Sequence, residues 1–383
     1  MTAHPYFEDT APDLAAFDAL VSQTLSPADL RFTDTVEKNV PIYDAAALAP
    51  VLADAARRRS LLAEWADVFG RTAGVLVLKG AGDRSAIDAA TEVYLRIIAE
   101  EKAGTGGGAD HFAAAGKNDR IWNSAQKLCL IAPEVFARYF ASPSIQAVCE
   151  AWLGPGSQMT AQVNLVRPGG RAQEPHRDYH LGFQTEEVAR NFPVHAHVLS
   201  AALTLQGALA HCDMPVESGT TQLLPFSQTY PEGYLAYRHA AFRELFASRR
   251  IQLPLAQGDA VFFNPALFHA AGDNDTADIA RMANLLQISS PFGRAMESLD
   301  RSAMVRALYP VLADMDLRPS ERAAVIAAAA EGYSFPTNLD TDPPVGGLAP
   351  ETQAALMTRC LDALAPFATF DAELARQDAR RRA

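Results

Sequence analysis

The stretch that decides the fold is EPHRDYH, residues 174–180. It places His176 and Asp178 two positions apart, and side chains two positions apart lie on the same face of an extended strand. One metal ion can therefore contact both. His269, far along the chain, would complete a set of two imidazoles and one carboxylate, the facial triad that leaves coordination positions open on Fe(II).

The residues around His176 and Asp178 support their assignment to a metal site. Residues 160–166 alternate polar and apolar side chains, which predicts a strand with one polar face, and a turn follows at residues 168–170. Further on, the run 258–263 leads through a proline to His269, and Arg281 lies on the next predicted strand. In a barrel, the polar strand face would line a ligand cavity.

The order and spacing of these motifs resemble the phytanoyl-CoA dioxygenase family of Fe(II)/2-oxoglutarate oxygenases. The motifs that carry the resemblance are Pro168-Gly169, His176-x-Asp178, Ser218-Gly219-Thr220 running to Leu224-Pro225-Phe226-Ser227, Gly258-Asp259, His269-x-x-Gly272-x-Asn274 and Arg281. The resemblance spans residues 75–293. It implies a mainly β core with flanking helices, namely a double-stranded β-helix, which is a jelly-roll or cupin-like barrel.

The resemblance also implies roles for individual residues. It makes His176, Asp178 and His269 the catalytic metal ligands for Fe(II), and Arg281 the partner of the far carboxylate of 2-oxoglutarate. A planar guanidinium can grip a carboxylate through two hydrogen bonds. 2-Oxoglutarate would chelate the iron and leave one position for O2, and its oxidative decarboxylation would release succinate and CO2.

This sequence departs from the family's pattern where a hydroxyl donor to the cosubstrate is often found. The residue two after the distal histidine is Ala271, and residues 225–228 read PFSQ where the family often has Pro-Gly-Ser-His. We therefore expect a different donor to the carboxylates of 2-oxoglutarate. The expected cosubstrate-binding residues besides Arg281 are Gln162, Asn164 and Thr204.

Substrate contacts are expected from two segments rich in aromatic and cationic side chains. The candidates are His111, Arg120, Trp122, Lys127, Tyr179 and His180. The cations among them favour a small polar or anionic substrate. The alternative is that Trp122 belongs to the core and the cations face solvent. His180 shares the face of the metal ligands only if the strand stays regular.

Other histidines are interpreted without a functional role. His211, with Asp213, is interpreted as a loop feature, and His195 and His197 as polar surface or strand-end residues. The run 198–209 is apolar throughout and predicts a strand, whereas the pattern over residues 234–248 predicts an inserted helix.

The chain divides by pattern into three segments. Residues 1–70 are expected to form a helical N-terminal extension, residues 71–293 the oxygenase barrel with its supporting helices, and residues 294–383 a helical C-terminal extension packed on the same domain. Within the barrel segment, helices are predicted over residues 85–102 and 132–153, with a break at Pro143. The two helical extensions could form the interface of a homo-oligomer.

Composition excludes several classes of partner. The 383-residue chain is 49% hydrophobic and carries a formal net charge of −12, which argues against nucleic acid. Its four cysteines are scattered singly, so any metal must rely on His and carboxylate ligands. No apolar run is long enough for a membrane span, and the first residues do not read as a signal peptide. We therefore expect a cytoplasmic protein with no membrane partner.

The prediction is an Fe(II)- and 2-oxoglutarate-dependent dioxygenase that hydroxylates or otherwise oxidises a small-molecule substrate. Two alternatives stay open. One is an oxygenase that performs desaturation or ring closure on the same iron. The other is a barrel that binds metal and 2-oxoglutarate without turnover, as a sensor or binding protein. The fold alone does not identify the substrate.

Overall fold

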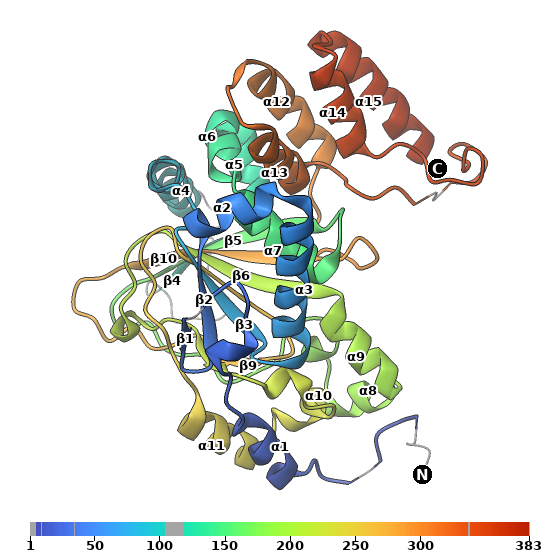
Figure 1. Cartoon of the computed structure of the whole chain (residues 1–383). Helices are drawn as coiled ribbons and strands as arrows, with labels where there is room; N and C mark the ends of the chain where they lie inside the picture. The colour runs from blue at the N-terminus through green and yellow to red at the C-terminus, as the bar shows by residue number, and fades with distance from the viewer. Residues whose placement is uncertain (1–4, 9, 34, 104–117, 336–337, 383) are drawn as a thin grey trace.

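The computed structural model describes residues 5–8, 10–33, 35–103, 118–335 and 338–382. Its centre is one large sheet of eight strands facing a small sheet of two (Figure 1). Helices pack outside the sheets, and in the described part of the chain none has the length and apolar character that a membrane crossing requires.

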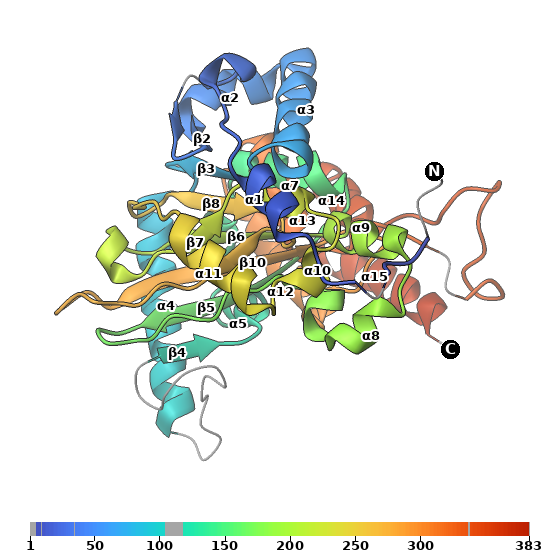
Figure 2. The ribbon, with the colours of Figure 1, turned by 90° about the horizontal axis from the view of Figure 1, so that it is seen from below.

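The large sheet is antiparallel except where β2 pairs with β3. Figure 2 shows its strands side by side. In their order across the sheet they are β1 (Val36–Glu37), β2 (Val40–Asp44), β3 (Val75–Lys79), β8 (Ala260–Phe263), β6 (Thr204–Ala210), β10 (Arg281–Ser289), β5 (Gln158–Val166) and β4 (Asn118–Ile121).

The small sheet consists of β7 (Gln222–Leu224) and β9 (Phe268–Ala270). Single bridges extend it on both sides, where His176 pairs with His269 and Ile251 pairs with Leu223. Side chains from both sheets line a shared cavity of about 650 Å³. Two facing, mainly antiparallel sheets around one cavity are a jelly roll, so the predicted double-stranded β-helix with flanking helices is confirmed.

Strand β10 shows how the sequence fixes the register of the large sheet. Its odd-numbered residues from Arg281 to Gln287 line the cavity, whereas Met282, Leu286 and Ile288 are buried in the hydrophobic core. Cross-strand pairs run without a break from Arg281 opposite Val166 to Ser289 opposite Gln158. A slip of the register by one residue would point every cavity side chain of β10 into the core. The alternation of cavity and core residues therefore strongly favours the observed pairing of β10 with β5.

Several helices begin where the sequence offers a side-chain cap. Ser142 caps α7 through its side chain and Pro143 occupies the first turn, as predicted. The helices of the N-terminal half are α1 (Leu14–Val21), α2 (Ala45–Ala53), α3 (Ala55–Arg71), α4 (Arg84–Ala103), α5 (Ser124–Ile131), α6 (Pro133–Tyr139) and α7 (Pro143–Leu153).

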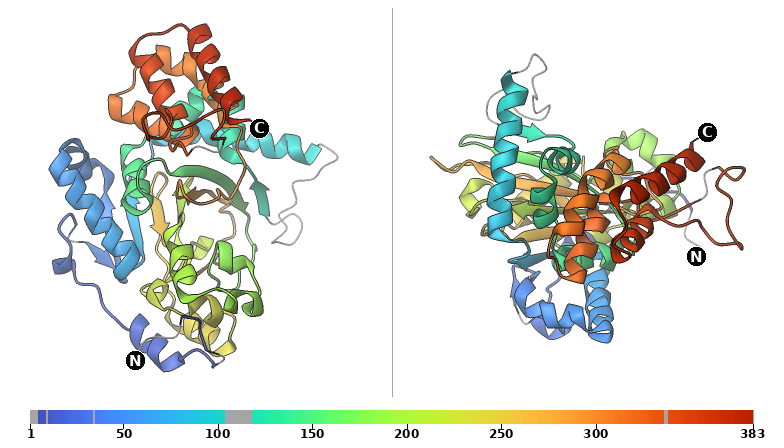
Figure 3. Two further views of the ribbon diagram at one scale, coloured as in Figure 1. Left: turned by 90° about the vertical axis from the view of Figure 1, so that its right-hand side faces the viewer. Right: turned by 90° about the horizontal axis from the view of Figure 1, so that it is seen from above.

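The helices of the C-terminal half lie in two places. Two pairs, α8 (Glu186–Arg190) with α9 (Val194–Ala202) and α10 (Gly233–Ala236) with α11 (Ala240–Arg249), interrupt the strands. The last four gather in one group, shown orange to red in Figure 3: α12 (Arg301–Asp314), α13 (Pro319–Ala329), α14 (Gln353–Asp362) and α15 (Phe367–Arg381). Met357 and Phe370 of this group belong to the same buried core as the large sheet.

Two predictions about local structure are wrong in part. The run 198–209 is not one strand, because helix α9 ends at Ala202 before β6 begins. His197 and Ser200 are buried while Val198 and Leu199 are exposed, a three-residue spacing that belongs to a helix. The first 70 residues are also not wholly helical, since β1 and β2 extend the large sheet. The three-segment division itself stays a prediction.

His211 is buried in a polar network directly after β6 and joins that strand to α4 and α6. Its Nδ1 lies 2.8 Å from the Thr91 hydroxyl and its Nε2 lies 2.7 Å from the Tyr139 hydroxyl. Thr91 donates its own proton to the Ile87 carbonyl, so it accepts from Nδ1–H, and Nε2 accepts from Tyr139. Burial lowers the pKa of His211 to about 3, although Asp88 acts in the opposite direction.

This network predicts a pH dependence of stability. Unfolded chains protonate His211 near pH 6.5, whereas the folded protein keeps the imidazole neutral down to about pH 3. The free energy of unfolding therefore decreases by about 1.4 kcal/mol for each pH unit as the pH falls from 6.5 to about 3, because only the unfolded state binds the proton in this range. Urea unfolding of wild type and His211→Gln at several pH values measures this, and the wild type should show the steeper loss. Equal slopes would contradict the assignment.

Candidate metal centre

Three side chains from two chain segments meet at one end of the cavity. His176, Asp178 and His269 each offer one ligand atom, and these atoms all lie within 4.8 Å of one another. The backbones of His176 and His269 exchange two hydrogen bonds, 3.0 Å and 3.2 Å long. Asp178 is fixed by a backbone hydrogen bond from its N–H to the carbonyl of Pro265. The bridge therefore brings the two imidazoles together, and the Pro265 contact places the carboxylate beside them.

Backbone carbonyls set the tautomer of both imidazoles. Nδ1 of His176 lies 2.8 Å from the Glu174 carbonyl, and Nδ1 of His269 lies 2.7 Å from the Leu267 carbonyl. A carbonyl only accepts, so each Nδ1 carries the proton and each Nε2 presents its lone pair to the centre of the site. The two Nε2 atoms lie 3.5 Å and 3.3 Å from the Asp178 carboxylate.

The electrostatics of the site favour an ionised Asp178. Burial acts to raise the pKa of Asp178, but the neighbouring imidazoles of His176 and His269 bring it well below its ordinary value. Burial acts to lower the pKa of His176, but the contact with Asp178 raises it overall. For His269, burial and the neighbouring His176 together lower the pKa. A carboxylate and imidazole lone pairs are the donor set of a facial triad, so the residues present fit an Fe(II) ion.

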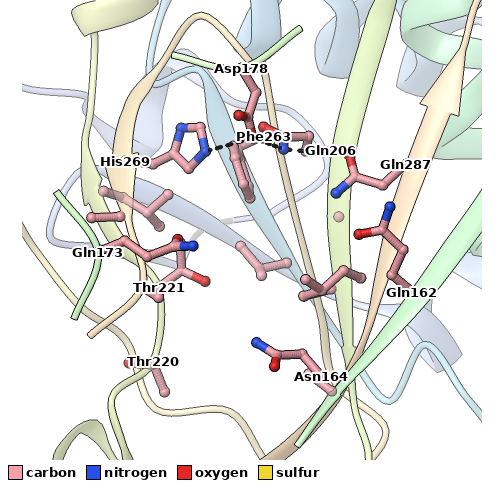
Figure 4. Close-up of a pocket in the computed structure, with 18 of the residues that line it drawn as sticks. Gln162, Asn164, Gln173, Asp178, Gln206, Thr220, Thr221, Phe263, His269 and Gln287 are labelled. Atoms are coloured by element: carbon pink, nitrogen blue, oxygen red, sulfur yellow. Dashed lines mark hydrogen bonds and ion pairs between the residues drawn. The ribbon is translucent and has the colours of Figure 1, made fainter. Parts of the chain in front are cut away.

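The cavity extends from the triad between the two sheets (Figure 4). Its volume of about 650 Å³ lies within the range of small-molecule sites. Apolar side chains of both sheets, such as Val261 and Leu223, form much of its wall. Amide side chains are concentrated on the large sheet, at Gln162 and Asn164 of β5, Gln206 of β6 and Gln287 of β10.

Arg281 lies on the cavity wall as the first residue of β10 and is only 8% exposed. In the part of the chain that the structure describes, no hydrogen bond or salt bridge involves its guanidinium. Burial lowers the pKa of Arg281 to about 10, which still leaves it charged at neutral pH. A buried cation without a protein partner is costly, and an anionic ligand would compensate it.

The other expected cosubstrate residues are placed differently from one another. Gln162 and Asn164 line the cavity. Thr204 is fully buried at the start of β6, on the same strand face as Gln206, but does not line the cavity. Thr204 precedes Gln206 by two residues, and the cavity wall on this strand begins at Gln206.

The expected substrate residues divide in the same way. Arg120 and Trp122 line the cavity, with the guanidinium 5.0 Å from the indole ring centre. Lys127 is not part of the wall and pairs with Glu101 at 2.5 Å. His111 lies outside the described residues.

The chain does not stay extended after Asp178. Tyr179 and His180 have φ values of 62° and 37°, a region that non-glycine residues rarely adopt. Tyr179 is buried and donates a hydrogen bond to the Gln287 side chain. His180 turns to the exterior, where its Nδ1 lies 3.1 Å from the Ser200 hydroxyl. Neither residue lines the cavity.

Sequence reasoning missed several polar residues of the cavity wall. They are Gln173, Gln206, Thr220, Thr221 and Gln287. Period-two counting could have predicted Gln287 and Gln206. Gln287 shares a strand face with Arg281 on β10, and Gln206 shares one with Thr204 on β6. Gln173, Thr220 and Thr221 lie outside the regular strands, where no such period applies.

The fold and site define the class of protein. The chain belongs to the phytanoyl-CoA dioxygenase (PhyH) family, whose sequence profile matches residues 70–283. The resemblance found in its motifs is thereby confirmed. No curated protein sequence matches the chain.

Several solved structures resemble the chain. The non-heme alpha ketoglutarate dependent epimerase SnoN from nogalamycin biosynthesis is 20% identical, with a TM-score of 0.44 over 61% of this chain and 84% of that chain. The corresponding carbocyclase SnoK is 17% identical, with a TM-score of 0.41 over 60% of this chain and 83% of that chain. EvdMO1 is 15% identical, with a TM-score of 0.42 over 60% and 50%.

Arg177, between two of the metal-site residues, anchors the segment that carries them. Its guanidinium is buried between the rings of Tyr234 and Phe268, with ring-centre distances of 5.1 Å and 5.2 Å. It donates hydrogen bonds to the carbonyls of Ser227 and Tyr230. Burial lowers the pKa of Arg177 to about 10. The side chain thus ties residues 176–178 to the segment that leads into α10.

Gly233 leaves the room for this guanidinium, which yields a prediction. A β-carbon at Gly233 would lie 1.8 Å from Arg177 Cζ, so Gly233→Ala must displace the guanidinium. We expect a loss of about 1–3 kcal/mol in the free energy of unfolding and weaker metal binding. The control is Gly293→Ala, whose β-carbon would have no neighbour closer than 3.7 Å. Urea unfolding and Mn(II) titration measure both effects, and equal behaviour of the two variants would refute the anchoring role.

Proposed function

We propose that the chain is an Fe(II)- and 2-oxoglutarate-dependent oxygenase that oxidises a small-molecule substrate. The observation that carries this proposal is one cavity that holds both a two-histidine, one-carboxylate triad and a buried arginine, Arg281, which has no hydrogen bond or salt bridge to any described residue. Membership of the phytanoyl-CoA dioxygenase family supports it. Among the outcomes open to such an enzyme, we propose hydroxylation first, with desaturation and ring closure as alternatives.

His176, Asp178 and His269 would hold the iron through two Nε2 atoms and one carboxylate oxygen. When bound, Fe(II) would supply the activation of O2 that is coupled to the decarboxylation of 2-oxoglutarate to succinate and CO2. Because Asp178 supplies a carboxylate, the protein itself fills the position that a halide takes in related halogenases. This favours an oxygenase outcome over halogenation.

Arg281 would bind the far carboxylate of 2-oxoglutarate. The apolar residues Val77, Leu253 and Val261 line the same cavity and would keep water from that ion pair, which strengthens it. Gln162 or Asn164 can replace the hydroxyl donor that is missing at Ala271. Arg120 and Trp122 remain our candidates for substrate contact.

The second candidate function is a protein that binds metal and 2-oxoglutarate without turnover. The absence of a hydroxyl group at Ala271 favours it, because one usual contact to the cosubstrate is then lost. Such a protein would bind Fe(II) and 2-oxoglutarate but would not form succinate. Cytoplasmic location and assembly into a homo-oligomer also remain proposals.

The main prediction concerns the metal ligands. We expect Fe(II)-dependent succinate formation from 2-oxoglutarate in the wild type, and a decrease of more than about 100-fold in His176→Ala and Asp178→Ala, because each loses a metal ligand. The matched control is His195→Ala, which changes an exposed histidine of α9 and should retain activity. Wild-type succinate yields in both ligand variants would refute the assignment.

A second prediction concerns Arg281. Loss of two charged hydrogen bonds in Arg281→Ala should raise the 2-oxoglutarate concentration required for half-maximal binding by roughly 10- to 100-fold. Arg281→Lys keeps the charge without the planar fork, so we expect an intermediate value. Titration of the Mn(II)-loaded protein with 2-oxoglutarate measures all three affinities. An unchanged curve for Arg281→Ala would remove this residue from the cosubstrate site.

A further inference from the structure

We propose that Gln206 and Gln287 select a substrate that places a neutral hydroxyl or carboxamide group beside the metal centre. The inference rests on the proposed function and deepens it by naming the chemical class of the substrate. It replaces the broader expectation of a polar or anionic substrate with a group that both donates and accepts a hydrogen bond.

The orientation of the Gln206 amide is fixed by Asp178. Gln206 Nε2 donates a hydrogen bond to Asp178 Oδ2, and Figure 4 shows this contact together with that of His269 to the same carboxylate. An ionised carboxylate only accepts, so the NH2 group of Gln206 must face it. Its Oε1 is therefore an acceptor. That atom is buried and has no hydrogen-bond partner among the described residues.

Gln287 presents the opposite polarity. It lies directly across from Gln206 in the pairing of β10 with β6. Its Oε1 accepts a hydrogen bond from the Tyr179 hydroxyl and lies 3.4 Å from Gln206 Nε2. Two donors face this oxygen, so the NH2 group of Gln287 points elsewhere, and no hydrogen bond to a described residue uses it. The pair, on the cavity wall, thus leaves one acceptor on Gln206 and one donor on Gln287 without a hydrogen-bond partner among the described residues.

This pattern discriminates between ligand groups. 2-Oxoglutarate at neutral pH carries only acceptors, so it leaves Gln206 Oε1 unsatisfied. A substrate carboxylate likewise has no donor for Gln206 Oε1, and an ammonium group cannot accept a hydrogen bond from Gln287. A hydroxyl or carboxamide satisfies both residues. A buried polar group without a partner is costly, so the matched ligand should bind more tightly.

The pair lies beside the metal centre. Gln206 contacts Asp178 directly and is paired with Phe263, whose ring centre lies 4.8 Å from that of His269. The substrate hydroxyl or carboxamide that binds the two glutamines would therefore lie close to the carbon that is oxidised. Trp122, Phe183 and Met296 line the same cavity and provide apolar surface for the body of the substrate.

Four probes with one ring and different polar groups test the proposal: benzyl alcohol, benzamide, benzoate and benzylamine. The protein is loaded with Mn(II), which replaces iron without turnover, and saturated with 2-oxoglutarate. Relaxation of the probe's ring protons by Mn(II) reports binding near the metal. We expect benzyl alcohol and benzamide to bind at least about tenfold more tightly than the two charged probes.

The variant Gln287→Leu removes the donor without touching a metal ligand. We expect it to weaken binding of benzyl alcohol and benzamide by about tenfold, while Mn(II) and 2-oxoglutarate still bind. Gln173→Leu is the matched control, because it changes another amide of the cavity wall, and among the described residues this amide has no hydrogen bond to Gln206 or Gln287. It should keep the wild-type preference.

Three outcomes would overturn the inference. They are equal or tighter binding of benzoate or benzylamine, absence of relaxation for all four probes, and an unchanged preference in Gln287→Leu, which would mean that water satisfies the pair. In each case Mn(II) and 2-oxoglutarate bind normally, so the proposed function survives. Failure of the wild type to bind Mn(II) or 2-oxoglutarate would instead overturn the proposed function and this inference with it.

Discussion

The antiparallel backbone bridge between His176 and His269 is the contact on which the metal centre depends. It joins two distant chain segments through a pair of hydrogen bonds and sets the two imidazoles with their ring centres 4.4 Å apart. The carbonyls of Glu174 and Leu267 then turn both Nε2 atoms toward Asp178. Side-chain choice alone would not achieve this, because each imidazole needs a backbone acceptor in the right place.

The large sheet acts as the counterpart to this bridge. Its strands carry cavity residues in rows, so that Phe263, Gln206 and Gln287 follow one another across β8, β6 and β10 at the level of the metal centre. Arg281 lies three period-two steps from Gln287 along β10. The distance between the triad and the guanidinium is therefore set by strand register, which the alternation of cavity and core residues protects.

The sequence predicted those parts of the structure that depend on order and periodicity. The grouping of His176, Asp178 and His269, the strand that begins at Arg281 and the helix break at Pro143 all follow from spacing or from a proline. What it did not predict depends on tertiary contacts. The backbone of Tyr179 and His180 leaves the extended region because Tyr179 is buried against Gln287, and the orientation of Gln206 is decided by Asp178. Helix α9 was missed because its apolar residues Val198 and Leu199 face outward.

The small sheet has a consequence for the energetics of folding. Its two strands are three residues long and are held to their neighbours by single bridges, so few hydrogen bonds oppose its local opening. A metal ion bound to both His176 and His269 would cross-link the two segments that carry them and close the long loop between them. This lowers the conformational entropy of the open state. Binding to the folded form alone also adds stability by mass action. Metal binding and formation of the small sheet would then be thermodynamically coupled, so that each favours the other.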